Sequence, residues 1–124
     1  MLGSEKIVAF VATSDPARAK VFYRDTLRLR LVSEDQFAVV FNAGGTMLRV
    51  SIVPKVAAAP YTVLGWEVST IVEAARKMEK AGIKFERFER LDQDELGIWN
   101  APSGAKVAWF KDPDGNLLSI TQFA

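Results

Sequence analysis

Apolar residues in the first half of the chain form one helical and several extended patterns. The apolar, β-forming run at residues 6–13 predicts a buried strand. Ser14-Asp15-Pro16 then predicts the start of a helix, because proline lacks the N–H group that the first helical turn leaves unpaired. This helix is predicted to bury one apolar face, formed by Ala19, Phe22, Tyr23 and Leu27. Three strands are predicted after it, at residues 29–32, 37–41 and 47–53.

The second half repeats this order after a linker predicted at residues 54–60. A helix is predicted from about residue 70 to 81, with Ser69 as its N-cap and Gly82 as the left-handed residue that ends it. The strands of this half are predicted at residues 61–68, 83–88, 97–100, 106–110 and 117–122. The last two strands are joined by Asp112-Pro113-Asp114-Gly115-Asn116, which predicts a hairpin turn held by local hydrogen bonds rather than an active site.

Two offsets align the halves with each other. Ser14 and Ser69, which precede the two predicted helices, are 55 residues apart, and the turn glycines Gly45 and Gly115 are 70 apart. Each half is therefore predicted to be a βαβββ module, with a polar insertion at residues 89–105 in the second. The chain is predicted to be a single α+β domain, residues 1–124, because a module of about 60 residues is marginal alone. Its parts are module one at about 6–53 and module two at about 61–122.

The composition is typical of a globular protein and excludes several chemistries. Of 124 residues, 49% are hydrophobic and 25% are charged, and the net charge of +1 predicts neither a nucleic-acid nor a membrane partner. We recognise no signal peptide and no membrane-spanning stretch, so a cytoplasmic protein is expected. Because His and Cys are absent, a Ser–His–Asp triad, a thiolate nucleophile and a zinc finger are excluded.

Two motifs near the chain ends resemble the vicinal oxygen chelate superfamily, which includes glyoxalase I, bleomycin resistance proteins and extradiol dioxygenases. Residues 10–19, with Phe22-Tyr23 and Leu27, look like its opening strand, helix and FY…LG signature, although Arg28 replaces the usual glycine. Residues 110–118 look like its closing DPDGN hairpin. The resemblance implies two tandem modules whose mixed sheets curl into a cup, with the helices outside. It also implies a homodimer, as in many members.

The same resemblance locates the positions at which metal-using relatives hold their ion. They align with Val8, Arg49, Val63 and Ser119 in this chain. Valine has no donor atom and arginine carries a fixed positive charge, so these residues cannot form the shell of a divalent metal. We therefore expect no metal or other cofactor. Metal-dependent glyoxalase, fosfomycin-transferase and extradiol dioxygenase activities are not expected either.

Strand alternation predicts which residues face the cup. The candidate ligand-binding residues are Phe10, Met47, Arg49, Glu67, Trp99, Ser119 and Thr121. This mostly apolar set with a few polar groups is typical of a small-molecule site. Trp99, in the insertion, is predicted to overhang the mouth of the cup, whereas Trp66 and Trp109 are assigned to the core.

Arg49 has three interpretations at this point. It could bind an anionic group of a ligand through paired hydrogen bonds, form an ion pair with Glu67 across the cup, or reach solvent at the rim. The sequence leaves all three open.

Three functions follow from these residues. The first is a metal-independent protein that binds an apolar or aromatic small molecule, which could also be anionic. The second is a metal-independent lyase or isomerase with Glu67 as base and Arg49 as oxyanion stabiliser. The third is a dimeric interaction or regulatory module. Nothing in the sequence names the ligand or the substrate.

Overall fold

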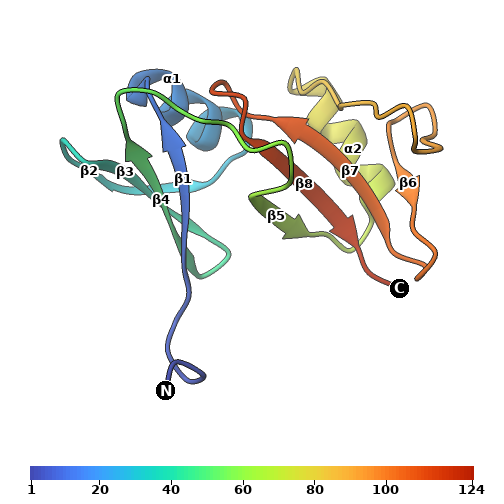
Figure 1. Ribbon diagram of the computed structural model, residues 1–124, viewed down its shortest axis with the longest axis horizontal. Helices are drawn as coiled ribbons and strands as arrows, with labels where there is room; N and C mark the ends of the chain where they lie inside the picture. The colour runs from blue at the N-terminus through green and yellow to red at the C-terminus, as the bar shows by residue number, and fades with distance from the viewer. The chain divides into compact units, whose positions relative to one another are not determined.

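The chain divides between Ala57 and Ala58, inside the predicted linker, into two compact units. The computed structural model describes all residues, 1–124. The units are Met1–Ala57 and Ala58–Ala124, drawn from blue to green and from green to red in Figure 1. Each contains a four-stranded mixed sheet and one helical segment, and neither sheet is a closed barrel. The predicted tandem βαβββ modules and the α+β class are confirmed.

The sheet of the first unit has the strand order β1-β4-β3-β2. The bounds of its strands are β1 Val8–Thr13, β2 Arg30–Glu34, β3 Ala38–Ala43 and β4 Thr46–Ile52. β1 runs parallel to β4, and the other neighbours are antiparallel. A two-residue turn joins β3 to β4, and Gly44 and Gly45 both have positive φ angles, 60° and 93°. Such a turn matches the right-handed twist of the two strands and favours glycine at both positions.

The helical segment of the first unit changes type along its length. It begins as the α-helix α1, Pro16–Lys20, with Asp15 as N-cap, whose carboxylate accepts from the Arg18 N–H at 3.2 Å. It continues as the π-helix η1, Val21–Thr26, and the Leu27 N–H donates to the Phe22 carbonyl at 2.9 Å. The predicted start at Pro16 is confirmed. The segment buries Tyr23 completely, next to Phe41 of β3 with ring centroids 5.8 Å apart.

Arg28 follows the π-helix in a left-handed conformation, with φ 63°. This conformation costs an L-residue roughly 1–2 kcal/mol. Replacing Arg28 by glycine would remove this cost, but the greater freedom of glycine in the unfolded chain would offset about 0.5–1 kcal/mol of that stabilisation. We expect Arg28→Gly to raise the free energy of unfolding by about 0.5–1 kcal/mol in a urea titration. Arg28→Ala removes the same charge and keeps the Cβ atom, so it should give no gain. Equal stabilisation by both variants would contradict the backbone explanation.

The sheet of the second unit has the corresponding order, β5-β8-β7-β6. Its elements are β5 Leu64–Glu67, the helix α2 Ile71–Lys80, β6 Trp99–Asn100, β7 Lys106–Lys111 and β8 Leu117–Gln122. α2 packs against β7 and β8 on one side of the sheet. The core on that side is built around Phe110, whose ring lies 6.2 Å from Trp66 and 6.1 Å from Phe85 between centroids. Neither α1 nor α2 is long and apolar enough to cross a membrane.

The strand register supports both offsets of the predicted repeat. Ala9 pairs with Leu48 in the first sheet, and Leu64 pairs with Leu118 in the second, which are shifts of 55 and 70 residues. The shift between the neighbouring strands β3 and β7 is one residue smaller, because Asn42 pairs with Met47 in the first sheet whereas Lys111 pairs with Leu117 in the second. The extra residue lies in the turn at 112–116. The Asp112 carboxylate accepts hydrogen bonds there from the N–H groups of Asp114 and Asn116 at 3.0 and 2.9 Å, as the local-bonding prediction requires.

The predicted strand at residues 83–88 is wrong. The backbone of this segment is connected to β7 only by an isolated bridge from Phe85 to Phe110 and a hydrogen bond from Glu86 N to Trp109 O, 2.8 Å. The Gln93 side chain explains why no further pairing forms. Its amide donates to the Glu86 carbonyl at 2.9 Å and accepts from the Phe88 N–H at 2.8 Å, so it replaces a neighbouring strand as their partner.

The predicted N-cap of the second helix is also wrong. Thr70 occupies the cap position and makes no side-chain capping bond. The side chain of Gln122, at the end of β8, instead accepts from the Ile71 N–H at 2.9 Å. A free N–H group of the first helical turn thus finds a partner far away in the sequence. β5 and β6 are shorter than predicted, and β5 begins at Leu64 rather than residue 61.

Candidate functional site

In the first unit, the helix covers one side of the sheet, and several side chains on the other side are exposed. α1 packs against β3 and β4, and Leu48 and Val50 on that side are at most 1% exposed. The register gathers alternate residues of the four strands on the opposite side. We name this side the first open face, and it includes Val8, Phe10, Arg30, Asn42, Met47 and Arg49.

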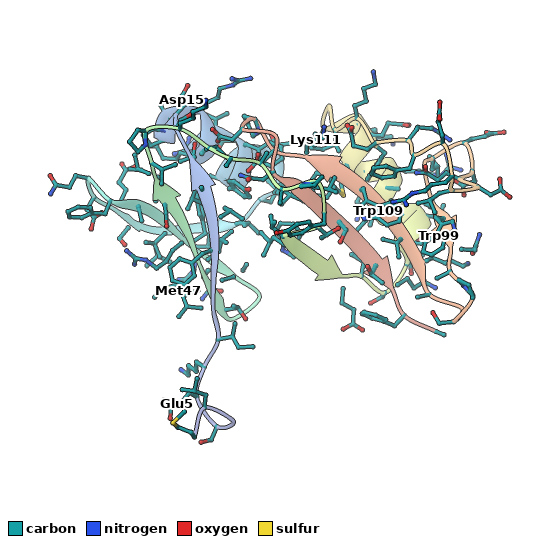
Figure 2. The ribbon with its side chains drawn as sticks, in the orientation of Figure 1. Glu5, Asp15, Met47, Trp99, Trp109 and Lys111 are labelled. Atoms are coloured by element: carbon teal, nitrogen blue, oxygen red, sulfur yellow. The ribbon has the colours of Figure 1, made fainter.

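Large apolar side chains lie uncovered on the first open face. Phe10 is 59% exposed, Met47 44% and Val8 40%. Phe10 pairs with Arg49, and Val8 pairs with Met47, whose position Figure 2 labels. The register therefore brings together three of the predicted ligand-binding residues, Phe10, Met47 and Arg49, on the face that their alternation predicts.

The second unit has an equivalent open side, opposite α2. Gly65 pairs with Ser119 and Glu67 with Thr121, and Ser119 pairs in turn with Trp109 of β7. Trp99 of β6 pairs with Val107, the next residue of β7 on this side. We name this side the second open face, and it includes Glu67, Trp99, Trp109, Lys111, Ser119 and Thr121. All four ligand-binding residues predicted from this half, Glu67, Trp99, Ser119 and Thr121, lie on it.

Three aromatic side chains meet on the second open face. The Trp109 ring centroid lies 6.0 Å from that of Trp99 and 5.4 Å from that of Phe88, which approaches edge-on at 86°. The Trp109 indole N–H donates to the Thr62 hydroxyl at 3.1 Å. We name Phe88, Trp99 and Trp109 the aromatic cluster, and Figure 2 shows Trp99 and Trp109 at β6 and β7.

The assignment of Trp109 to the core is wrong, whereas Trp66 does pack in the core against Phe110. Ala108 and Phe110 of β7 point to the helix side and are fully buried, so Trp109 between them points the other way. The sequence predicts that neighbouring residues of β7 point to opposite sides. It does not indicate which side faces the helix, because every residue from Val107 to Phe110 is apolar.

Ser119 sits in a confined place on the second open face. It is only 7% exposed, and a Cβ atom at position 65 would lie 2.7 Å from its hydroxyl oxygen. Glycine at position 65 therefore allows the Ser119 side chain to lie across β5. Ser119 offers a ligand little surface, whereas Glu67 beside it is exposed.

Arg49 makes no ion pair or hydrogen bond within residues 1–57. Its charge acts on Asp35, at the turn between β2 and β3. The pKa of Asp35 is lowered, mainly because its carboxylate accepts from Phe37 N and Ala38 N at 2.8 and 3.0 Å, and to a smaller extent because Arg49 is positive. The alternative pairing with Glu67 would join residues of different units and stays a prediction.

The residues at the four positions that the resemblance aligns with metal ligands do not fit a metal ion. Val8 and Val63 supply no donor atom, Arg49 repels a cation, and Ser119 alone offers one neutral oxygen. Nowhere in the chain do three or more Asp or Glu side chains gather in a group that could hold a metal ion. The donor set thus differs chemically from that of metal-using relatives.

Comparisons with solved structures agree with this architecture. A glyoxalase family protein from Enterococcus faecalis matches with a TM-score of 0.75 and 22% identity, over 98% of this chain and 100% of that one. A lactoylglutathione lyase from Agrobacterium tumefaciens matches with a TM-score of 0.72 and 20% identity, over 97% and 95% of the two chains. TioX from Micromonospora sp. ML1 matches with a TM-score of 0.71 and 19% identity, over 98% and 100%. At these identities, the likeness shows the fold.

A comparison of the sequence with family models identifies the family. No curated protein matches it significantly. A family model, however, matches residues 6–120, which include both βαβββ modules and both motifs on which the resemblance rests. With the duplicated fold and its structural relatives, this match shows that the chain belongs to the Glyoxalase/Bleomycin resistance protein/Dioxygenase superfamily.

Proposed function

We propose that this protein binds a small apolar or aromatic molecule on the open faces of its sheets, without the help of a metal ion. The observation that carries the proposal is the aromatic cluster on the second open face. Its three rings lie on the side of the sheet opposite α2, so they are not part of the core beneath the helix. Aromatic surface with a few polar groups beside it is the usual chemistry of a small-molecule site.

The polar groups beside the aromatic cluster would orient such a ligand. Lys111 lies on the strand of Trp109, two residues further along, and its ammonium group is 3.7 Å from a carboxylate oxygen of Glu86. Glu67 and Thr121 are paired across β5 and β8 on the same face. These groups provide one cation, one carboxylate and one hydroxyl around an aromatic surface, and each can fix a polar substituent of a ligand.

Metal independence is part of the proposal and rests on the donor chemistry at Val8, Arg49, Val63 and Ser119. Membership of the superfamily is compatible with catalysis as well, since one structural relative is a lactoylglutathione lyase. A metal-independent lyase or isomerase that uses Glu67 and Arg49 is therefore the second candidate function. Homodimer formation and a cytoplasmic location stay predictions from the sequence.

A titration with 1-naphthol, a neutral planar probe, tests the binding function. We expect binding by calorimetry, and we expect Trp99→Ala to weaken it about 10-fold, because an aromatic contact contributes about 0.5–1.5 kcal/mol beyond its buried area. The matched control is Val72→Ala, which shortens an exposed apolar side chain on α2. The proposal fails if the probe does not bind, or if the two variants bind it equally well.

A further inference from the structure

Two arginines share the first open face, and the sequence pattern revealed only one of them. Arg49 lies on β4 and pairs with Val40 of β3. Arg30 lies on β2 and pairs with Asn42, two residues from Val40 on the same strand. Residues two apart on a strand point to the same side, so Arg30, Asn42 and Arg49 occupy one face. A bulge between Leu31 and Ser33 interrupts the register of β2, and the simple alternation along that strand therefore misleads.

Neither arginine has a partner within the first unit. No hydrogen bond or ion pair within residues 1–57 involves the side chain of Arg30 or Arg49. Two other basic side chains of the unit do have an acidic partner, since Arg24 lies 2.7 Å from Asp25 and Lys20 lies 2.9 Å from Glu34. The positive charge on the first open face is therefore not neutralised by pairing.

The acidic residues of this unit lie elsewhere or are already engaged. Glu34 pairs with Val39, on the helix side of the sheet, where Lys20 meets it. Asp35 lies beyond the end of β2, and its carboxylate accepts from two backbone N–H groups. The positions that the register assigns to the first open face include no carboxylate. An anionic ligand would supply the negative charge that the positions on this face lack.

The spacing suits a single compact anion. Strand separation and rise per residue place the Cα atoms of Arg30 and Arg49 about 12 Å apart, a distance that two arginine side chains extended toward each other can span. Asn42 lies between them. Its Oδ1 atom accepts from Gly45 N at 2.8 Å, which leaves the Nδ2 donor to face a ligand. Guanidinium groups donate paired hydrogen bonds to oxyanions, and two such forks with an amide between them can surround one tetrahedral group.

We propose that the first open face binds the doubly charged oxyanion of a ligand whose remaining part is apolar, such as a phosphate monoester or a pair of neighbouring carboxylates. Arg30 and Arg49 hold the dianion, and the exposed side chains of Phe10, Met47 and Val8 contact the apolar part. Two fixed positive charges on one face are neutralised by two negative ones, which a monocarboxylate does not supply. This inference rests on the proposed function, because it assigns a charge to the ligand of the open faces.

A series of naphthalene probes of increasing charge tests it by calorimetry. The probes are neutral 1-naphthol, singly charged 1-naphthoate, and the dianions 1-naphthyl phosphate and naphthalene-2,3-dicarboxylate. We expect at least one dianion to bind about 10-fold or more tightly than 1-naphthoate. Arg30→Gln and Arg49→Gln should each remove about 10-fold of that affinity and leave 1-naphthol unaffected. The stronger dianion identifies which of the two chemistries the face prefers.

Two further variants keep the test sharp. Arg18→Gln removes the charge of an exposed arginine on α1, so it controls for the general field of the protein and should leave all affinities unchanged. Arg49→Lys keeps the charge but loses the planar fork, and an intermediate affinity for the dianion is expected. Melting temperatures of all variants verify that the replacements leave the fold intact.

The outcomes separate this inference from the proposed function. Equal affinities along the charge series, or equal effects of Arg18→Gln and Arg30→Gln, overturn the dianion site even if 1-naphthol binds and Trp99→Ala weakens it. Tight, Arg30-dependent binding of a dianion supports the site even if 1-naphthol alone does not bind. If none of the four probes binds, both proposals are rejected.

Discussion

Phe110→Ala is expected to lower the free energy of unfolding of the second unit by about 3–5 kcal/mol. Phe110 is fully buried on β7, its ring centroid is 6.2 Å from that of Trp66, and it is 6.1 Å from that of Phe85. Phe85 belongs to the segment that replaces the predicted strand at 83–88, and its bridge to Phe110 is one of the few links between that segment and β7. Truncation of Phe110 would both leave a cavity in the core and weaken the contact between Phe85 and β7.

Urea unfolding followed by tryptophan fluorescence measures this loss, because all three tryptophans lie in residues 58–124. Phe123→Ala is the matched control, since Phe123 lies just after β8 and is 63% exposed. The control should change stability by no more than about 0.5 kcal/mol. A loss below about 1 kcal/mol for Phe110→Ala would contradict its place at the centre of the core.

Tyr23→Ala is expected to destabilise the first unit by a similar amount, about 3–5 kcal/mol. Tyr23 is completely buried in the π-helix η1, and its ring contacts Phe22 edge-on at 5.1 Å and Phe41 at 5.8 Å between centroids. Its carbonyl oxygen accepts from Leu29 N at 2.9 Å, so the residue also connects the helical segment to the start of β2. The side chain thus contributes most of the aromatic packing between η1 and the sheet.

Far-UV circular dichroism in urea follows this loss, because the first unit has no tryptophan. Val21→Ala, in the same helix but 50% exposed, serves as its control and should cost less than about 1 kcal/mol. If the two variants unfold at the same urea concentration, Tyr23 does not stabilise the core as proposed. Tryptophan fluorescence of Tyr23→Ala reports in addition whether the second unit unfolds with the first.

Much of the fold could be predicted from the sequence, because local patterns determine it. The alternation at residues 117–122 matches β8 residue for residue, and Pro16 marks the first residue of α1. Turn chemistry at Gly44-Gly45 and at 112–116 places the two final hairpins, and hence the repeat. Where a turn and a strand pattern agree, no distant contact is needed to specify the element.

Side chains that lie outside the segment concerned determine the two features that could not be predicted, the absence of a strand at residues 83–88 and the cap of α2. Gln93 supplies the partners that a strand at 83–88 would have found in a neighbour, and Gln122 caps a helix that begins 51 residues before it. A glutamine is uninformative in a local pattern, since it favours neither turn nor strand strongly. Its role appears only when the fold brings it to an unpaired backbone group.

The same reasoning applies to the candidate site. Strand phase could be predicted for Arg49 and Thr121, because apolar and polar positions alternate from Leu48 to Ser51 on β4 and from Leu118 to Thr121 on β8. Phe10 and Glu67 are instead in phase with Val8 and Val63, the positions that the resemblance to metal-using relatives supplies. Arg30 was missed because a bulge interrupts β2, and Trp109 because β7 is apolar on both sides. A face exposed to ligand can be as apolar as a face buried under a helix, and composition then cannot distinguish them.

The extra residue in the hairpin between β7 and β8 bears on how such a protein can change in length. One residue inserted within β7 would exchange the two sides of the strand, so that Trp109 would turn under α2 and Phe110 would turn toward solvent. In the turn, the same insertion leaves every pairing from Leu117 to Gln122 in phase. An extra residue in the turn thus leaves the two sides of the adjoining strands unchanged, which is how two copies of one pattern can differ in length yet keep equivalent faces.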